Sequence, residues 1–156
     1  MNAIRTETLK PPPMPNRKFL VASLFLLTLP AHESLGQQSP LGIQIANVEK
    51  NKGKVVVEIY RDKSTWLEKP FRKTTLSTNE GSKTVSFDVP DGRYAISLYQ
   101  DINGNGKLDM NFLGIPKEPV GFGNNYKPFG SPKFESSSIE HNSTSKPQAI
   151  KLYDAL

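Results

Sequence analysis

Short runs of alternating apolar and polar residues, separated by turns, recur along most of this chain. Residues 41–46 and 84–89 place an apolar side chain at every second position, which is the spacing of a strand with one buried face. Residues 54–60 are rich in the β-branched residues that strands favour. Turn residues follow at 51–53 and 90–92, and no stretch has a convincing helical period. The pattern predicts an all-β domain.

About seven strands are expected, forming an antiparallel β-sandwich. Residues 41–46 and 54–60 are predicted to pair as a hairpin around the intervening turn. The other expected strands are residues 73–76, 84–89, 93–100, 134–140 and 148–153.

Two aromatic residues have predicted structural roles. Trp66, with Leu67, is expected to plug one end of the core. Tyr94 either ties its hydroxyl back to an upstream carbonyl, as in a tyrosine corner, or is an ordinary core tyrosine.

The first 36 residues are predicted to be an N-terminal extension and a signal peptide, leaving residues 37–156 as the single domain. An uncharged apolar run of eleven residues, 19–29, follows Arg17 and Lys18, and small residues precede a cleavage point after Gly36. The run is too short to span a bilayer comfortably. We therefore expect a secreted or periplasmic protein with no membrane span after cleavage. Translation from Met14 would give a signal of ordinary length, and both starts stay open.

Composition narrows the possible functions. The chain has no cysteine, which excludes disulfides, thiolate metal sites and a cysteine nucleophile. Removing the first 36 residues takes away four basic and two acidic residues and leaves a formal charge of +3. The lysines are scattered, so no nucleic-acid partner is expected. The only histidine of the mature part, His141, lies in a polar turn where we expect it to be solvated.

One long segment, residues 101–133, departs from the strand pattern and is expected to be an ordered loop closing one end of the sandwich. Six of the chain's eleven glycines and four prolines fall there. Interspersed aromatic residues argue against simple disorder. Two interpretations of these aromatics stay open: a platform for a glycan or peptide, or anchors that fold inward. The predicted ligand-binding residues are Phe112, Phe122, Asn124, Asn125, Tyr126 and Phe129.

The start of this loop has oxygen-bearing side chains at alternate positions and a glycine where a calcium loop turns. The predicted calcium ligands are the side chains of Asp101, Asn103, Asn105 and Asp109 and the carbonyl of Lys107. A calcium loop would carry a carboxylate at its twelfth position, where this chain has Phe112. Asn111 or Glu118 could complete the shell. The alternative is a metal-free turn in which these side chains cap backbone amides.

The same region carries a resemblance to a known family. The stretch from Asp101 to Asp109, followed by residues 113–125, resembles the bacterial family called domain of unknown function 2141. The resemblance extends over most of residues 37–156. It implies an exported immunoglobulin-like or transthyretin-like β-sandwich of unestablished biochemical role, and it implies no catalytic residues.

Three functional hypotheses follow. An enzyme is not expected, because no nucleophile–base pair is indicated; Glu118 beside Asp109 is a conceivable carboxylate pair, but both fit loop roles better. A structural or accessory domain of the cell envelope is the preferred hypothesis, with an unidentified envelope component as partner and a monomeric state. A carbohydrate- or peptide-binding module that uses residues 101–134 is the alternative.

Overall fold

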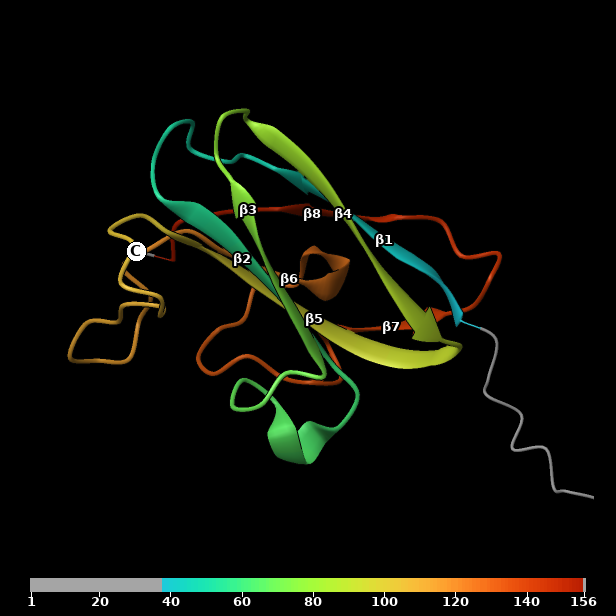
Figure 1. Cartoon of the computed structure of the whole chain (residues 1–156). Helices are drawn as coiled ribbons and strands as arrows, with labels where there is room; N and C mark the ends of the chain where they lie inside the picture. The colour runs from blue at the N-terminus through green and yellow to red at the C-terminus, as the bar shows by residue number, and fades with distance from the viewer. Residues whose placement is uncertain (1–37, 156) are drawn as a thin grey trace, which may run out of the picture. The chain divides into compact units, whose positions relative to one another are not determined.

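The computed structural model describes residues 38–155, which form two β-sheets packed face to face (Figure 1). The predicted signal peptide, residues 1–36, lies outside the described residues. Two short 3₁₀ helices, η1 (Lys63–Thr65) and η2 (Gly123–Asn125), are the helical elements of the described part. The strands are β1 (Gln38–Ala46), β2 (Lys54–Tyr60), β3 (Arg72–Ser77), β4 (Ser82–Pro90), β5 (Gly92–Asp101), β6 (Val120–Phe122), β7 (Ser138–His141) and β8 (Gln148–Lys151).

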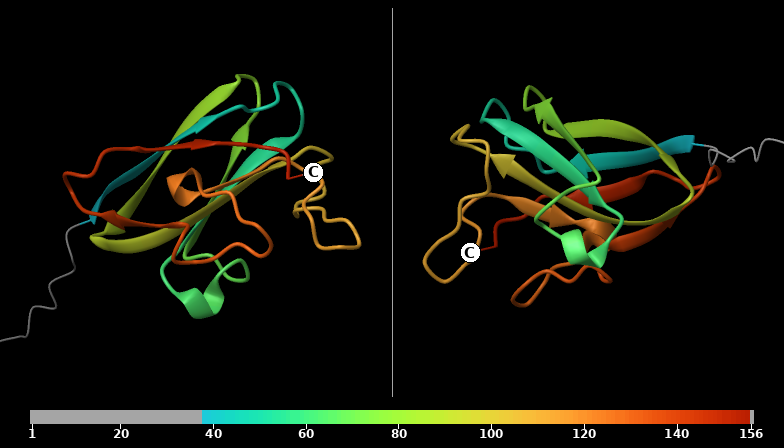
Figure 2. Two further views of the ribbon diagram at one scale, coloured as in Figure 1. Left: turned by 180° about the vertical axis from the view of Figure 1, so that it is seen from behind. Right: turned by 60° about the horizontal axis from the view of Figure 1, so that its bottom comes forward.

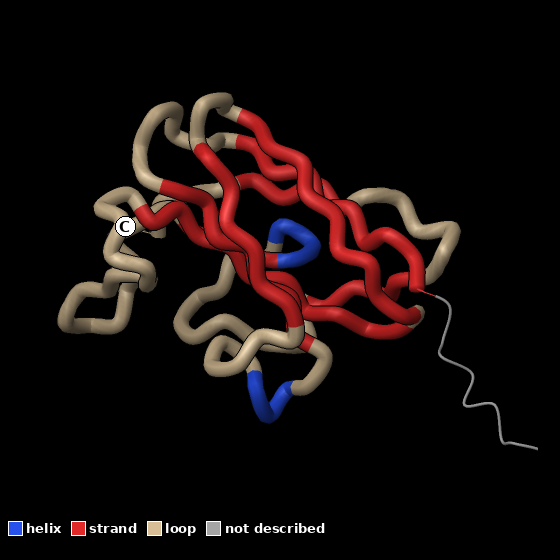
Figure 3. Tube along the Cα trace, viewed as in Figure 1, coloured by secondary structure: helices blue, strands red, loops and turns tan. Residues whose placement is uncertain are grey.

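The predicted sandwich is confirmed, with eight strands in place of about seven. One sheet has the order β4-β1-β8 and the other runs β3-β2-β5-β6, with β7 also paired to β5. The additional strand, β6, arises inside the segment that was predicted to be one long loop (Figure 3). The sandwich is antiparallel except for β1 and β8, which run parallel with Ile43 opposite Gln148.

The main core lies between the two sheets, where alternation places one face of each strand. Leu41, Ile43 and Ile45 of β1 are each at most 1% exposed. They belong to one cluster with Tyr94, Ile96 and Leu98 of β5. This confirms the predicted inward face of residues 93–100. Burial of a large apolar side chain contributes roughly 1.5–3 kcal/mol, so this layer is the main source of stability.

The predicted hairpin between residues 41–46 and 54–60 is wrong, because the two strands lie in different sheets. β1 pairs with β4 and β8, whereas β2 pairs with β3 and β5. The connection, residues 47–53, is long enough to cross between the layers. The buried side chain of Gln100 holds it: its Nε2 donates to the carbonyls of Glu49 and Lys52 at 2.8 and 2.7 Å. Period-two alternation defines a strand but not its partner.

The five-stranded sheet is covered on both faces. Its outer face carries Val56, Tyr60 and Tyr99, all buried although they point away from the other sheet. Residues 61–71 and the later part of the long segment lie over them (Figure 2). The sequence prediction of a loop that closes only one end of the sandwich therefore needs correction: residues 120–122 join this sheet as β6, and Phe122 and Phe134 belong to two smaller buried clusters on its outer face.

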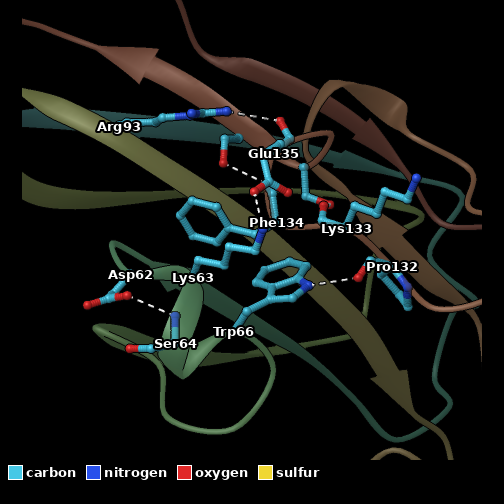
Figure 4. A network of polar contacts seen from close by, with 11 residues as sticks. Asp62, Lys63, Ser64, Trp66, Arg93, Pro132, Lys133, Phe134 and Glu135 are labelled. Carbon is cyan, nitrogen blue, oxygen red and sulfur yellow. Dashed lines mark hydrogen bonds and ion pairs between the residues drawn. The ribbon is translucent and has the colours of Figure 1, made fainter.

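Trp66 contacts both segments that lie over the outer face of the five-stranded sheet. Its ring lies edge-on to Tyr60 at 4.9 Å and to Phe134 at 6.0 Å between centroids. Its Nε1 donates to the carbonyl of Pro132 at 3.0 Å (Figure 4). Trp66 thus packs on a sheet face and does not plug an end. The expectation for Leu67 is wrong, because that side chain is 43% exposed.

Of the two interpretations of Tyr94, the tie to an upstream carbonyl is correct. Its hydroxyl donates to the carbonyl of Pro90, four residues upstream, at 2.7 Å, which is the tyrosine-corner arrangement. The ring itself is fully buried in the main core. The bond fixes the tight connection between β4 and β5, where the chain passes from one sheet to the other.

Candidate functional site

The carboxylate of Asp101 organises the first turn of the 101–118 loop. Asp101 is the last residue of β5 and is 3% exposed. Its Oδ1 accepts the amides of Gly104 and Asn105 at 2.8 and 3.1 Å, and its Oδ2 accepts the amide of Gly106 at 2.8 Å. Gly104 and Gly106 have φ of 75° and 83°, a region that glycine enters without strain. One carboxylate therefore caps three amides of a tight turn.

Asn103, Asn105 and Asp109 converge beside this turn. The Nδ2 atoms of Asn103 and Asn105 donate to Oδ2 of Asp109 at 2.6 and 2.9 Å. These two hydrogen bonds, that from Asn103 first, hold the pKa of the Asp109 carboxyl below its ordinary value. The Lys107 amide donates to Oδ1 of Asn105 at 3.0 Å, so its main chain belongs to the same turn. The structure thus brings the four predicted side chains into one turn, and it places the amide of Lys107 there in place of the predicted carbonyl.

Glu118 braces the loop from the far side. It is 5% exposed, and its two oxygens accept the amides of Ile102 at 2.8 Å and Asp109 at 3.1 Å. Asn111 has a similar role, because its Oδ1 accepts the amides of Leu113 and Ile115. Both residues were expected to be able to complete a calcium shell. The structure uses their oxygens to cap backbone amides.

The hydrogen bonds are those of the metal-free alternative, because the side-chain oxygens of Asp101, Asn103 and Asn105 accept backbone amides. Two carboxylates, Asp101 and Asp109, and two amides lie within one turn. Over residues 38–155, no three Asp, Glu, His or Cys side chains group so as to hold a metal ion. An ion here would therefore use two carboxylates, amide or carbonyl oxygens and water, which is typical of low-affinity calcium sites.

The six predicted ligand-binding residues do not form one platform. Phe122 is 5% exposed and packs with Val56, Tyr99 and the partly buried Tyr126. Phe112 and Phe129, in contrast, are 95% and 109% exposed. The inward-anchor interpretation is therefore right for Phe122 and Tyr126 and wrong for the other two aromatic residues.

The two predicted asparagines hold strands together. Asn124 donates to the carbonyl of Ser138 at 2.8 Å. Asn125 donates to the carbonyl of Ala149 at 2.7 Å and accepts the amide of Lys151 at 2.8 Å. Asn125 thus pairs with the free edge of β8 as a neighbouring strand would. These amides serve the fold, which removes the polar half of the predicted platform.

A shallow hollow of about 290 Å³ lies beside Asn125, and sequence reasoning missed it. Lys127, Lys151 and Tyr153 are among the residues that line it. The Lys127 ammonium lies 4.8 Å from the centroid of the Tyr153 ring. Residues this far apart in the sequence give no local signal of such a pairing.

The expectation that His141 is solvated is wrong. His141 ends β7 and is 3% exposed, with its Nε2 2.9 Å from Oγ of the buried Ser39. Its Nδ1 has no hydrogen-bond partner within the described structure. Asp91 lies 3.5 Å from the serine hydroxyl and not at that free nitrogen, so the three side chains lack the order of a catalytic triad. The polar turn predicted around His141 begins one residue later.

Glu58, Lys73 and Tyr60 form a polar cluster outside the loop, and this cluster also serves the fold. Glu58 binds the Lys73 ammonium at 2.9 Å and accepts the hydroxyl of Tyr60 at 2.8 Å. Burial, followed by the bond to Glu58, raises the pKa of the Tyr60 phenol far above its ordinary value. A buried phenol held neutral in this way is not an activated nucleophile.

Together these features define an all-β sandwich protein with an Asp- and Asn-capped loop and a covered outer sheet face. A family model described as "Uncharacterized protein conserved in bacteria (DUF2141)" matches residues 43–149. That match spans more than half of the chain, and the chain belongs to this family. No curated protein and no solved structure matches it.

Proposed function

We propose that this chain is an exported, non-catalytic accessory domain of the bacterial cell envelope that acts as a monomer. The observation that carries the proposal is that the acid and base side chains of the candidate sites are committed to the fold. Glu118 caps two amides, Glu58 pairs with Lys73 and Tyr60, and His141 contacts a buried serine. General acid–base chemistry needs such groups to reach a substrate.

Export is supported by the sequence. The basic pair before an apolar run of eleven residues is typical of a signal peptide. A cysteine-free domain with a well-filled core needs no disulfides outside the cytoplasm. Among residues 38–155, no helix has the length and apolar character needed to cross a membrane.

The test of export is the N-terminus and location of the native protein. We expect the chain recovered from the periplasm or the medium to begin at Gln37. A chain that retains residues 1–36 and fractionates with the cytoplasm would contradict the proposal.

We further propose that the 101–109 loop binds Ca²⁺ weakly and that the ion stabilises the loop. The sequence spacing of Asp101, Asn103, Asn105 and Asp109 supports this role, and the ion would displace the two side-chain amides that donate to Asp109 in the metal-free loop. With a Kd on the order of 10⁻³ M, about 10 mM Ca²⁺ would stabilise the folded state by about 1.4 kcal/mol. For a domain of this size that raises the melting temperature by about 5 °C.

Thermal melts with Ca²⁺ and with a chelator measure this effect. Asp109→Asn should lose the increase in melting temperature. Asp88→Asn, at an exposed carboxylate on β4, is the matched control and should keep it. An identical melt of the unsubstituted chain in both conditions would leave the metal-free turn as the correct interpretation.

A further inference from the structure

Two loops of this chain carry fully exposed aromatic residues. The first, residues 107–117, presents Met110, Phe112 and Leu113, which are 53%, 95% and 67% exposed. The second, residues 127–133, presents Phe129, which is 109% exposed. Soluble proteins rarely hold several large apolar side chains together in water without a binding role.

The first loop holds its tip in a defined shape. Met110 and Pro116 form an isolated β-bridge across its base. Within the tip, the Asn111 amide donates to the carbonyl of Ile115 at 2.9 Å, and the Asn111 side chain caps Leu113 and Ile115. Gly114, with φ of 75°, allows the reversal. The outward position of Phe112 and Leu113 is therefore built by the loop's own hydrogen bonds.

Each loop is flanked by exposed lysines: Lys107 and Lys117 in the first, Lys127 and Lys133 in the second. None of the four makes an ion pair within the described structure. The acidic side chains of the first loop are engaged internally, because Asp109 accepts two amide groups and Glu118 caps two backbone amides. Lys107, Lys117 and Lys133 are therefore available to meet anionic groups, whereas the Lys127 ammonium lies over the Tyr153 ring.

The two loops project from the same side of the domain. In Figure 1 and in both views of Figure 2, the gold segment that follows β5 and the orange segment that follows η2 extend in the same direction. The backbones of both loops can therefore approach one surface from the same direction. Apolar side chains that enter the headgroup region, ringed by cations, are the pattern of interfacial membrane binding.

We propose that these two loops dock the domain on a lipid surface that carries anionic headgroups. Phe112, Leu113 and Phe129 would enter the boundary between headgroups and acyl chains, while Lys107, Lys117 and Lys133 would contact lipid phosphates. This inference rests on the proposed export, which brings the domain to a membrane face of the envelope. It names an anionic lipid surface as the partner, which the proposed accessory function leaves unidentified.

Sedimentation with vesicles tests the proposal on residues 37–156, which contain both sheets and all three buried clusters. The vesicles are phosphatidylcholine alone, or phosphatidylcholine with about one third phosphatidylglycerol. We expect at least tenfold stronger binding to the anionic vesicles. The double variant F112S/L113S should weaken that binding about tenfold or more. Both residues are exposed, so the melting temperature of this variant should not change.

A matched pair of lysine variants separates a local site from overall charge. K117Q/K133Q should weaken binding to anionic vesicles severalfold. K50Q/K146Q removes the same charge from exposed lysines outside the two loops and should leave binding unchanged.

Several results would overturn the lipid assignment. The first is that the chain sediments with neither kind of vesicle. The second is that F112S/L113S binds as strongly as the unsubstituted chain. The third is that K50Q/K146Q loses as much binding as K117Q/K133Q. If the chain binds no vesicles but self-associates, and F112S/L113S abolishes that self-association, the partner of this surface is a second copy of the chain. If the chain does not bind vesicles but is found outside the cytoplasm, the lipid proposal is wrong and the proposed function stands. If the chain is found in the cytoplasm, the proposed function is wrong whatever the vesicle experiment shows.

Discussion

Replacing Gly53 with alanine is expected to destabilise the domain by about 4 kcal/mol, because this glycine lies directly against another strand's backbone. A Cβ at this position would lie 1.8 Å from the carbonyl oxygen of Asp101 and 2.8 Å from Cα of Ile102. Both contacts are backbone atoms that cannot rotate away. Since Asp101 also caps the loop, the clash would disturb the β2–β5 pairing and the loop together.

A second glycine provides the matched control. Gly114 has a similar positive φ, 75° against 54° for Gly53, but no atom lies within 4 Å of its would-be Cβ. Gly114→Ala should therefore lose only about 1 kcal/mol from the left-handed backbone conformation. Denaturant unfolding of both variants measures the difference. Equal losses would show that the close approach at Gly53 is not real.

Asp101→Ala is expected to reduce the free energy of unfolding by about 3 kcal/mol, even with a chelator present. The substitution removes a buried carboxylate that accepts three amides, and a hydrogen bond to a charged group makes a net contribution of about 1.5–3 kcal/mol. Gly104 and Gly106 lie in an exposed turn, so water replaces part of the loss.

Two companion variants sharpen this prediction. Asp101→Asn keeps one accepting oxygen and should lose less stability than the alanine variant. Asp88→Ala, at an exposed carboxylate on β4, should unfold nearly as the unsubstituted chain does. If Asp101→Ala also unfolded like the unsubstituted chain, neither the metal-free cap nor a calcium ligand would describe this residue.

Local patterns in the sequence predicted the strands well but not their partners. The alternation in residues 41–46 and 84–89 marks two strands that pair with each other although 37 residues separate them in the chain. The sequence pattern of residues 54–60 does not indicate that they belong to the other sheet. A signal of the covered outer face was present, however. The run Val55-Val56-Val57 is apolar on both faces, as in strands buried on both sides.

The candidate site was predictable to the same degree. The spacing from Asp101 to Asp109 identified a capped turn, because Asx side chains at alternate positions favour such turns whether or not a metal binds. The fate of each aromatic residue depended on tertiary packing. Phe122 is buried because β6 pairs with β5 at Ser97, whereas Phe112 lies on a hairpin tip with no strand beneath it.

Residues 101–137 form an ordered structure whose buried anchors support exposed tips. Hydrogen exchange of individual backbone amides measures this order. We predict that the amides of Gly104 and Gly106, bound to Asp101, and that of Ile102, bound to Glu118, exchange far more slowly than unstructured amides. Exchange of these three amides at the rate of an unfolded chain, while β5 stays protected, would show that the loop is not ordered.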